Sequence, residues 1–219
     1  MMFCEALMKL AILTTDTFHH AYFVREIARR GDDIRVLLEE NALRPPFETA
    51  HPFEKIRDED EADIWFQGGR ARTSDFAETV AVPTVNETKA ISALRDFGAD
   101  AAVVFGTGRL TASTIAACPP TLLNLHGGDP EEYRGLDTHL WAIYHGDFPA
   151  LITTLDKIAP RLDAGDIVQR RVHGAGGRLR ERRLQGLDHS GRGDRLAIVC
   201  DDTRREGYAQ PRPGLIPLP

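Results

Sequence analysis

Three polar residues of this chain carry side chains suited to acyl-transfer chemistry. Asn124 and His126 lie in the segment LLNLHGG, and Asp163 lies in LDAGDIV. An amide can donate a hydrogen bond to the oxyanion of a tetrahedral intermediate. An imidazole can move a proton near neutral pH, and a carboxylate can orient that imidazole or a water. Because side chains two apart on a strand share a face, Asn124 and His126 can serve one site.

Each of these signals alone also has a simpler structural explanation. An isolated Asn-x-His is more often a capped turn at a strand end, and LDAGDI can form a tight turn around Gly165. The segment Tyr133-Arg134-Gly135 can be an ordinary surface turn. A metal held by His126 and Asp163 lacks a third ligand at suitable spacing, so no metal is expected. It is the joint order of the segments that favours a chemical role.

The composition is that of an ordinary globular protein. The chain has 219 residues, of which 42% are hydrophobic and 27% charged, and its net charge is −6. This charge argues against a general nucleic-acid binder, which needs a basic surface. No apolar run approaches the roughly 20 residues that cross a bilayer, and the N-terminus lacks the basic region of a signal peptide. Three distant cysteines without a CxxC pair favour a reducing cytoplasm.

Short apolar runs alternate with helical patterns, which predicts an α/β fold with a doubly wound, mostly parallel sheet. The predicted strands are Lys9–Thr14, Ile34–Leu38, Val80–Val85, Ala101–Phe105 and Thr121–Leu125. The predicted helices are His20–Arg30, Glu87–Phe97 and the segment THLWAIYHGD. Pro83 has no N–H, which suits an edge strand. Ligands of such sheets bind beyond the carboxyl ends of the strands, where Phe105–Gly108 and Asn124–His126 are expected.

The composition changes after Val172, so we expect a folded domain at 1–172, which holds the candidate catalytic residues, and a C-terminal segment at 173–219. Within the first, residues 1–7 are expected to be a non-structural extension, and the acidic run Asp58–Asp63 the solvated face of a helix. The second is rich in Gly and Arg, with nine arginines against six acidic residues. It has almost no apolar periodicity, so it is predicted to be partly irregular or disordered.

The ordered set of motifs resembles the folate-dependent formyltransferase family, which includes glycinamide ribonucleotide, methionyl-tRNA and nucleotide-sugar N-formyltransferases. The motifs that carry the resemblance are FGTGRL (105–110), LLNLHGG (122–128), YRG (133–135), WAIYHGD (141–147) and LDAGDIV (162–168). The resemblance covers roughly residues 9–172 and implies a Rossmann-like catalytic domain.

The resemblance also implies roles for particular residues. The family's catalytic triad maps onto Asn124, His126 and Asp163. The loop that lines the pocket for the pterin of N10-formyltetrahydrofolate maps onto Phe105, Gly106, Thr107, Gly108, Arg109 and Leu110. The residues expected to contact the substrate are His19, His20, Tyr133, Arg134 and Gly135. For His19 and His20, the alternative is a capped helix start with partly exposed imidazoles.

Two departures indicate which branch of the family this chain resembles most. Gly127–Glu132 stands where the purine and initiator-tRNA branches usually have Ser-Leu-Leu-Pro after the His. The opening TTDTFHHAYFVREI (14–27) is similar to enzymes that modify amino sugars on nucleotide carriers. It also replaces the Gly/Ser phosphate-binding loop of the purine enzymes with Thr14–Thr17.

The function that this resemblance implies is transfer of a formyl group from N10-formyltetrahydrofolate to a nucleotide-linked amino sugar, for example a dTDP-4-amino-4,6-dideoxyhexose. The setting would be lipopolysaccharide or glycan biosynthesis in the cytoplasm. The expected partner is a small-molecule nucleotide sugar, dTDP-linked by preference. No nucleic-acid or membrane partner is expected, and the resemblance is compatible with a homodimer. Two alternatives stay open: formylation of another small amine of purine-pathway or amino-acid type, and a catalytically degenerate folate- or nucleotide-binding protein.

Overall fold

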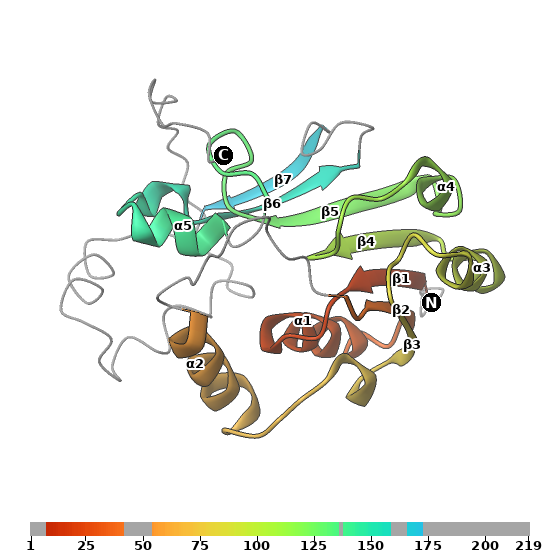
Figure 1. Cartoon of the computed structure of the whole chain (residues 1–219), viewed down its shortest axis with the longest axis horizontal. Coiled ribbons are helices and arrows are strands. Elements are labelled where there is room, and N and C mark those ends of the chain that lie inside the picture. The colour runs from red at the N-terminus through yellow and green to blue at the C-terminus, as the bar shows by residue number, and fades with distance from the viewer. Residues whose placement is uncertain (1–7, 42–53, 136–137, 159–165, 173–219) are drawn as a thin grey trace, which may run out of the picture. The chain divides into compact units, whose positions relative to one another are not determined.

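The structure is a computed structural model that describes residues 8–41, 54–135, 138–158 and 166–172 (Figure 1). Asp163, residues 1–7 and the segment 173–219 lie outside the described residues. The described strands are β1 (Lys9–Thr14), β2 (Asp33–Glu39), β3 (Glu78–Val82), β4 (Ala101–Phe105), β5 (Thr121–Gly127), β6 (Ile152–Lys157) and β7 (Ile167–Val172). The described α-helices are α1 (Phe18–Ala28), α2 (Glu54–Phe66), α3 (Thr88–Phe97), α4 (Ala112–Ile115) and α5 (Thr138–Tyr144). Short 3-10 turns lie at Thr73–Asp75 and Phe148–Ala150.

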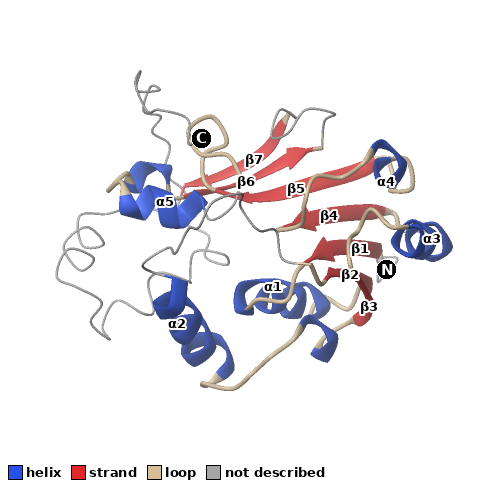
Figure 2. Cartoon of the chain, viewed as in Figure 1, coloured by secondary structure: helices blue, strands red, loops and turns tan. Residues whose placement is uncertain are grey.

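The seven described strands form one sheet in the order β3-β2-β1-β4-β5-β6-β7, with helices between most of them along the chain (Figure 2). The ladders β3–β2, β2–β1, β1–β4 and β4–β5 are all parallel. This confirms the predicted doubly wound, mostly parallel sheet. It also places β3 at an edge, as Pro83 immediately after it predicted.

Apolar helices cover both faces of the parallel strands. On one face, Leu94 and Phe97 of α3 pack with Leu13 and Leu37 in one hydrophobic cluster. On the other, Val24 of α1 packs with strand residues that include Ile12 and Val36. Because both faces are buried, β1 has consecutive apolar residues rather than the alternation of a half-exposed strand.

The chain divides into two compact units. Among the described residues, the first contains everything up to His126 together with Thr154–Arg170, and the second contains Gly127–Thr153 and the last described residues. The second unit has its own small apolar cluster, formed by Tyr133, Ala142, Ala150 and Leu151. None of the described helices is long and apolar enough to cross a membrane.

Several predicted boundaries differ from the structure. The strands Lys9–Thr14 and Ala101–Phe105 are confirmed to the residue, whereas β5 continues to Gly127 and so includes both Asn124 and His126. The acidic run does lie on a helix, but its prediction as a solvated face is wrong for Asp60 and Glu61, which are only 8% and 4% exposed. Glu61 is buried because its carboxylate bonds to the imidazole of His19, at 3.1 Å.

The packing of β1 predicts a large stability loss when its central side chain is truncated. Leu13 is fully buried between the strands and α3. Leu13→Ala should lower the free energy of unfolding by about 2–5 kcal/mol, through lost burial and the cavity left behind. Urea unfolding measures this. The control Ser92→Ala, at an exposed position of α3, should change it by less than about 0.5 kcal/mol, and an equal loss in both would contradict the assignment.

Candidate active site at the carboxyl edge of the sheet

The candidate site begins where β1 and β4 end side by side. Thr14 and Phe105 are the last residues of the two strands and are paired in register. The hydroxyl of Thr14 donates to the carbonyl oxygen of Phe105 at 2.8 Å. This bond joins the turn that leads into α1 to the loop predicted to hold the pterin.

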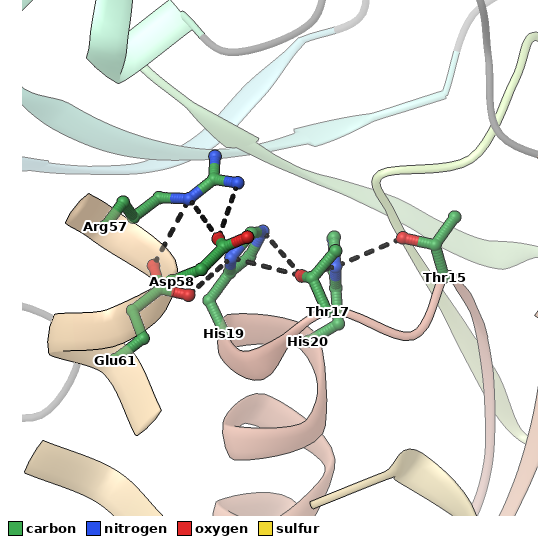
Figure 3. A network of polar contacts seen from close by, with 7 residues as sticks. All are labelled: Thr15, Thr17, His19, His20, Arg57, Asp58 and Glu61. Atoms are coloured by element: carbon green, nitrogen blue, oxygen red, sulfur yellow. Dashed lines mark hydrogen bonds and ion pairs between the residues drawn. The ribbon is translucent and has the colours of Figure 1, made fainter. Parts of the chain in front are cut away.

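A polar network surrounds the start of α1 (Figure 3). The hydroxyl of Thr17 lies 2.6 Å from Nδ1 of His20 and 3.1 Å from Nδ1 of His19. Because this hydroxyl bonds to the imidazoles, Thr17 makes no side-chain cap to the helix backbone. The hydroxyl of Thr15 also reaches Nδ1 of His20, at 3.1 Å. The network continues to α2 through the His19–Glu61 contact.

His20 is a buried, neutral imidazole that supports the loop after β4. Its side chain is 5% exposed, and its ring lies edge-on to the ring of Phe105 with centroids 4.3 Å apart. Burial lowers the pKa of His20 well below its ordinary value of 6.5, and the nearby charges of His19 and Arg57 lower it further. The alternative of partly exposed imidazoles is therefore wrong for His20, although it fits His19, whose side chain is 27% exposed.

Gly106 passes directly over this imidazole. A Cβ placed on Gly106 would collide with Nε2 of His20, and the residue has φ +80°, a conformation that favours glycine. His20 and Gly106, predicted as substrate- and cofactor-binding residues, are thus brought into direct contact.

The same loop is anchored from its other side by a buried carboxylate. Glu39, the last residue of β2, is 5% exposed. Its two oxygens accept hydrogen bonds from the backbone N–H of Gly108 at 3.1 Å and of Val85 at 2.9 Å. The hydroxyl of Thr84 donates to it at 3.3 Å. A buried carboxylate is tolerated when it accepts several hydrogen bonds, and here these bonds tie the loops after β3 and β4 together.

Asn86 anchors the far end of the loop. Its amide nitrogen donates to the carbonyl oxygen of Arg109 at 3.0 Å, and its amide oxygen accepts from the backbone N–H of Thr111 at 2.8 Å. The backbone from Gly106 to Thr111 is therefore held at several points before any ligand arrives.

Asn124 and His126 lie on one face of β5, as predicted from their spacing. Asn124 pairs in register with Val104 of β4, so it lies close to the start of the Phe105–Leu110 loop. Its amide nitrogen donates to a carboxylate oxygen of Asp156 at 3.3 Å. His126 is 8% exposed, and its carbonyl oxygen accepts from the hydroxyl of Thr154 at 3.5 Å.

Tyr133, Arg134 and Gly135 belong to the second unit. The Tyr133 side chain is 6% exposed, and its hydroxyl donates to Asp147 at 3.4 Å. Burial, and then the charge of Asp147, raise the pKa of Tyr133 to about 12. Nε of Arg134 donates to the carbonyl oxygen of Pro130 at 2.8 Å, and Gly135 has φ +93°.

Asp163 lies outside the described residues, so its place behind His126 stays a prediction. Among the described residues there is no group of three or more His, Cys, Asp or Glu side chains that could hold a metal ion.

Sequence reasoning also missed the buried carboxylates of Glu39 and Asp156. A signal for the first was present, because an acidic residue ends the strand DIRVLLE directly after the apolar run 36–38. Thr154 and Asp156 are two residues apart in ITTLDK, so their side chains are expected on the same face of the strand. Nothing along the chain shows that Asn124 lies opposite Asp156.

Comparison with known proteins connects the chain with formyltransferases. No family model matches it. Over 87 residues it is 37% identical to a methionyl-tRNA formyltransferase of Nitratidesulfovibrio vulgaris, which covers 39% of this chain and 26% of that protein. The chain therefore matches only about a quarter of that relative's length. The match supports the formyltransferase family for the part that it covers.

Solved structures show the same fold. The chain superposes with a TM-score of 0.50 on glycinamide ribonucleotide transformylase 1 from Geobacillus kaustophilus, at 16% identity, covering 88% of this chain and 100% of that one. It superposes equally, with a TM-score of 0.50 and 12% identity, on phosphoribosylglycinamide formyltransferase from Bacillus halodurans, covering 88% and 97%. The fold class predicted from the sequence is thereby confirmed.

The contact between Gly106 and His20 predicts a steric effect that a second substitution relieves. Gly106→Ala should destabilise the protein, whereas the same change in a His20→Ala background should cost less. Gly98→Ala is the matched control, because Gly98 also has positive φ but a Cβ placed on it would meet no described atom within 4 Å. Unfolding midpoints measure all four variants. If Gly106→Ala costs the same with and without His20, the collision is not what makes Gly106 necessary.

The lowered pKa of His20 predicts that stability falls with acidity. Below the ordinary pKa of 6.5 the unfolded chain binds a proton that the folded protein does not. This contribution is fully present above that pH and decreases as the pH falls, by up to about 1.4 kcal/mol per pH unit. Urea unfolding between pH 5 and 7.5 should give a free energy of unfolding that depends less steeply on pH in His20→Asn than in wild type. Parallel curves for wild type and His20→Asn would contradict this.

Proposed function

We propose that this protein transfers a formyl group from N10-formyltetrahydrofolate to the amino group of a nucleotide-linked amino sugar. The observation that carries the proposal is the placement of Asn124 and His126 on one face of β5, with Asn124 paired to β4 just before the anchored loop Phe105–Leu110. The partial sequence match to a named formyltransferase supports the reaction class.

In the proposed reaction, the sugar amine attacks the formyl carbon of the donor. A C–N bond forms as the carbonyl becomes a tetrahedral oxyanion, and the bond from that carbon to N10 of the folate then breaks. The proton lost by the amine ends on N10. The products are a formamide and tetrahydrofolate, with no change of oxidation state and no other reactant.

Asn124 and His126 would divide this work. The amide of Asn124 would donate to the oxyanion, where a preorganised donor in a water-poor site has its largest effect. The imidazole of His126, only 8% exposed, would carry the proton from the amine toward N10. Asp163 would orient that imidazole, a role that comes from the family resemblance alone.

The loop Phe105–Leu110 would hold the pterin of the donor. Its backbone is fixed by Glu39 at Gly108 and by Asn86 at Arg109, so its N–H and C=O groups would face the donor with little ordering left to do on binding. The surface around His19 would contact the sugar substrate. For Tyr133, Arg134 and Gly135, a role in substrate binding comes from the family resemblance alone.

The choice of a nucleotide-linked amino sugar as acceptor, dTDP-linked by preference, rests on two segments. They are TTDTFHHAYFVREI (14–27) and the insert Gly127–Glu132. The same resemblance suggests cytoplasmic glycan biosynthesis as the setting and allows a homodimer. Because the similar proteins are named for methionyl-tRNA and phosphoribosylglycinamide, those two acceptors are the necessary competitors in any test.

The direct test mixes the protein and the formyl donor with an acceptor panel and detects formylated product by mass. The panel contains dTDP-linked 4-amino sugars, phosphoribosylglycinamide, methionyl-tRNA and free amino acids. We expect product with an amino-sugar nucleotide. Product with another acceptor and none with any amino-sugar nucleotide would refute the sugar assignment but would still support formyl transfer. Tight donor binding without product from any acceptor would favour the binding-only alternative.

The roles of Asn124 and His126 predict large losses of turnover. Asn124→Ala and His126→Ala should each lower kcat by at least about a hundredfold, because each group acts on charge or protons that develop during the reaction. The control Leu125→Val changes the opposite face of the same strand and should stay within a few-fold of wild type. A near-wild-type rate for either alanine variant would remove that residue from the mechanism.

A further inference from the structure

Two hydrogen bonds establish how β6 lies against β5. The backbone N–H of Ile158 donates to the carbonyl oxygen of Leu122 at 3.2 Å. The hydroxyl of Thr154 donates to the carbonyl oxygen of His126 at 3.5 Å. Residue numbers therefore rise along β5 as they fall along β6, so the two strands run antiparallel. The same register places Asp156 directly opposite Asn124.

Along the face that β5 and β6 share, the side chains change from apolar to polar between one cross-strand pair and the next. Leu122 and Ile158 are opposite each other. Leu122 belongs to the hydrophobic cluster that includes residues of α3, and the partly buried Ile158 packs against that cluster. The next pair on that face is Asn124 with Asp156, and the one after it is His126 with Thr154. Directly opposite residues of an antiparallel pair have neighbouring side chains. The two proposed catalytic residues thus each have a polar partner across the strand.

Asp156 is the unexpected member of this set. It is 4% exposed, and its carboxylate oxygen lies 3.3 Å from the amide nitrogen of Asn124. Burying a carboxylate costs free energy unless it is well bonded, and apolar residues occupy the neighbouring pair on the same face. We propose that Asp156 is a positioning residue that fixes the orientation of the Asn124 amide for formyl transfer. This inference rests on the function proposed above.

The mechanism follows from the chemistry of the two groups. A carboxylate only accepts hydrogen bonds, so it must face the amide nitrogen of Asn124 and not the amide oxygen. That nitrogen carries a second N–H, which stays available to the formyl oxygen as it gains negative charge. An amide without such a partner can turn over and present its own oxygen, which repels the oxyanion. Asp156 acts through Asn124 and touches no reacting atom.

The test is a double-substitution cycle on kcat. Asp156→Leu removes the hydrogen-bond acceptor and should lower kcat about tenfold to a hundredfold, which is less than the loss expected for Asn124→Ala. The KM for the formyl donor should change little. Asp156→Asn retains an acceptor oxygen and should fall between wild type and Asp156→Leu. In an Asn124→Ala background, Asp156→Leu should cost almost nothing more, because the amide that Asp156 is proposed to orient has been removed.

A matched control separates positioning from general damage. Ile158→Ala alters the neighbouring cross-strand pair, so it should lower the melting temperature while leaving kcat within a few-fold of wild type. Losses that multiply in the Asn124→Ala, Asp156→Leu double variant would overturn the proposal, as would a wild-type kcat for Asp156→Leu.

An NMR measurement decides the contact without relying on activity. The side-chain NH₂ signals of Asn124, identified by their loss in Asn124→Ala, should exchange slowly in wild type and faster in Asp156→Leu, which removes the acceptor. Unchanged exchange would show that Asp156 does not hold the amide. If wild type forms no product with any amine, the proposed function fails, and this measurement still tests the contact.

Discussion

The register of the parallel strands is the constraint on which the rest of the site depends. Thr14 pairs with Phe105 across β1 and β4, and Val104 pairs with Asn124 across β4 and β5. These pairings bring the turn before α1, the loop after β4 and the polar end of β5 to one edge of the sheet. A slip of one residue in β5 would turn Asn124 and His126 to the opposite face. Such a slip is opposed because it would also remove Leu122 from the hydrophobic cluster that it shares with Leu94 and Phe97 of α3.

Buried polar groups then hold this edge in a single arrangement. Glu39 bonds to the backbone of the loops after β3 and β4, and His20 supports Gly106 from beneath. Each is costly to bury, and each offsets that cost by bonding to partners whose positions it fixes. The loop proposed to bind the folate is therefore organised by groups outside it. This explains why its own sequence, FGTGRL, needs only small and flexible residues where the backbone passes close to its neighbours.

The sequence predicted the fold well and the site in part. Strands such as Lys9–Thr14 were predictable because burial on both faces leaves an uninterrupted apolar run bounded by polar turns. The shared face of Asn124 and His126 followed from strand periodicity alone. Asp156 and Glu39 could not be assigned, because their roles depend on which residues lie across the sheet and in the neighbouring loops. The burial of Glu61 was missed for the same reason: its partner, His19, is on another helix.

The central proposal is that Asn124 and His126 catalyse transfer of a formyl group from N10 of the folate to an amine. Carbon-13 NMR of donor labelled at the formyl carbon, mixed with protein and a dTDP-linked 4-amino sugar, follows that carbon directly. We expect the donor signal to be replaced by an equal formamide signal. We expect no such change with the Asn124→Ala, His126→Ala double variant. A donor signal that persists with the wild-type protein, or that decays only to formate, would contradict formyl transfer at this face.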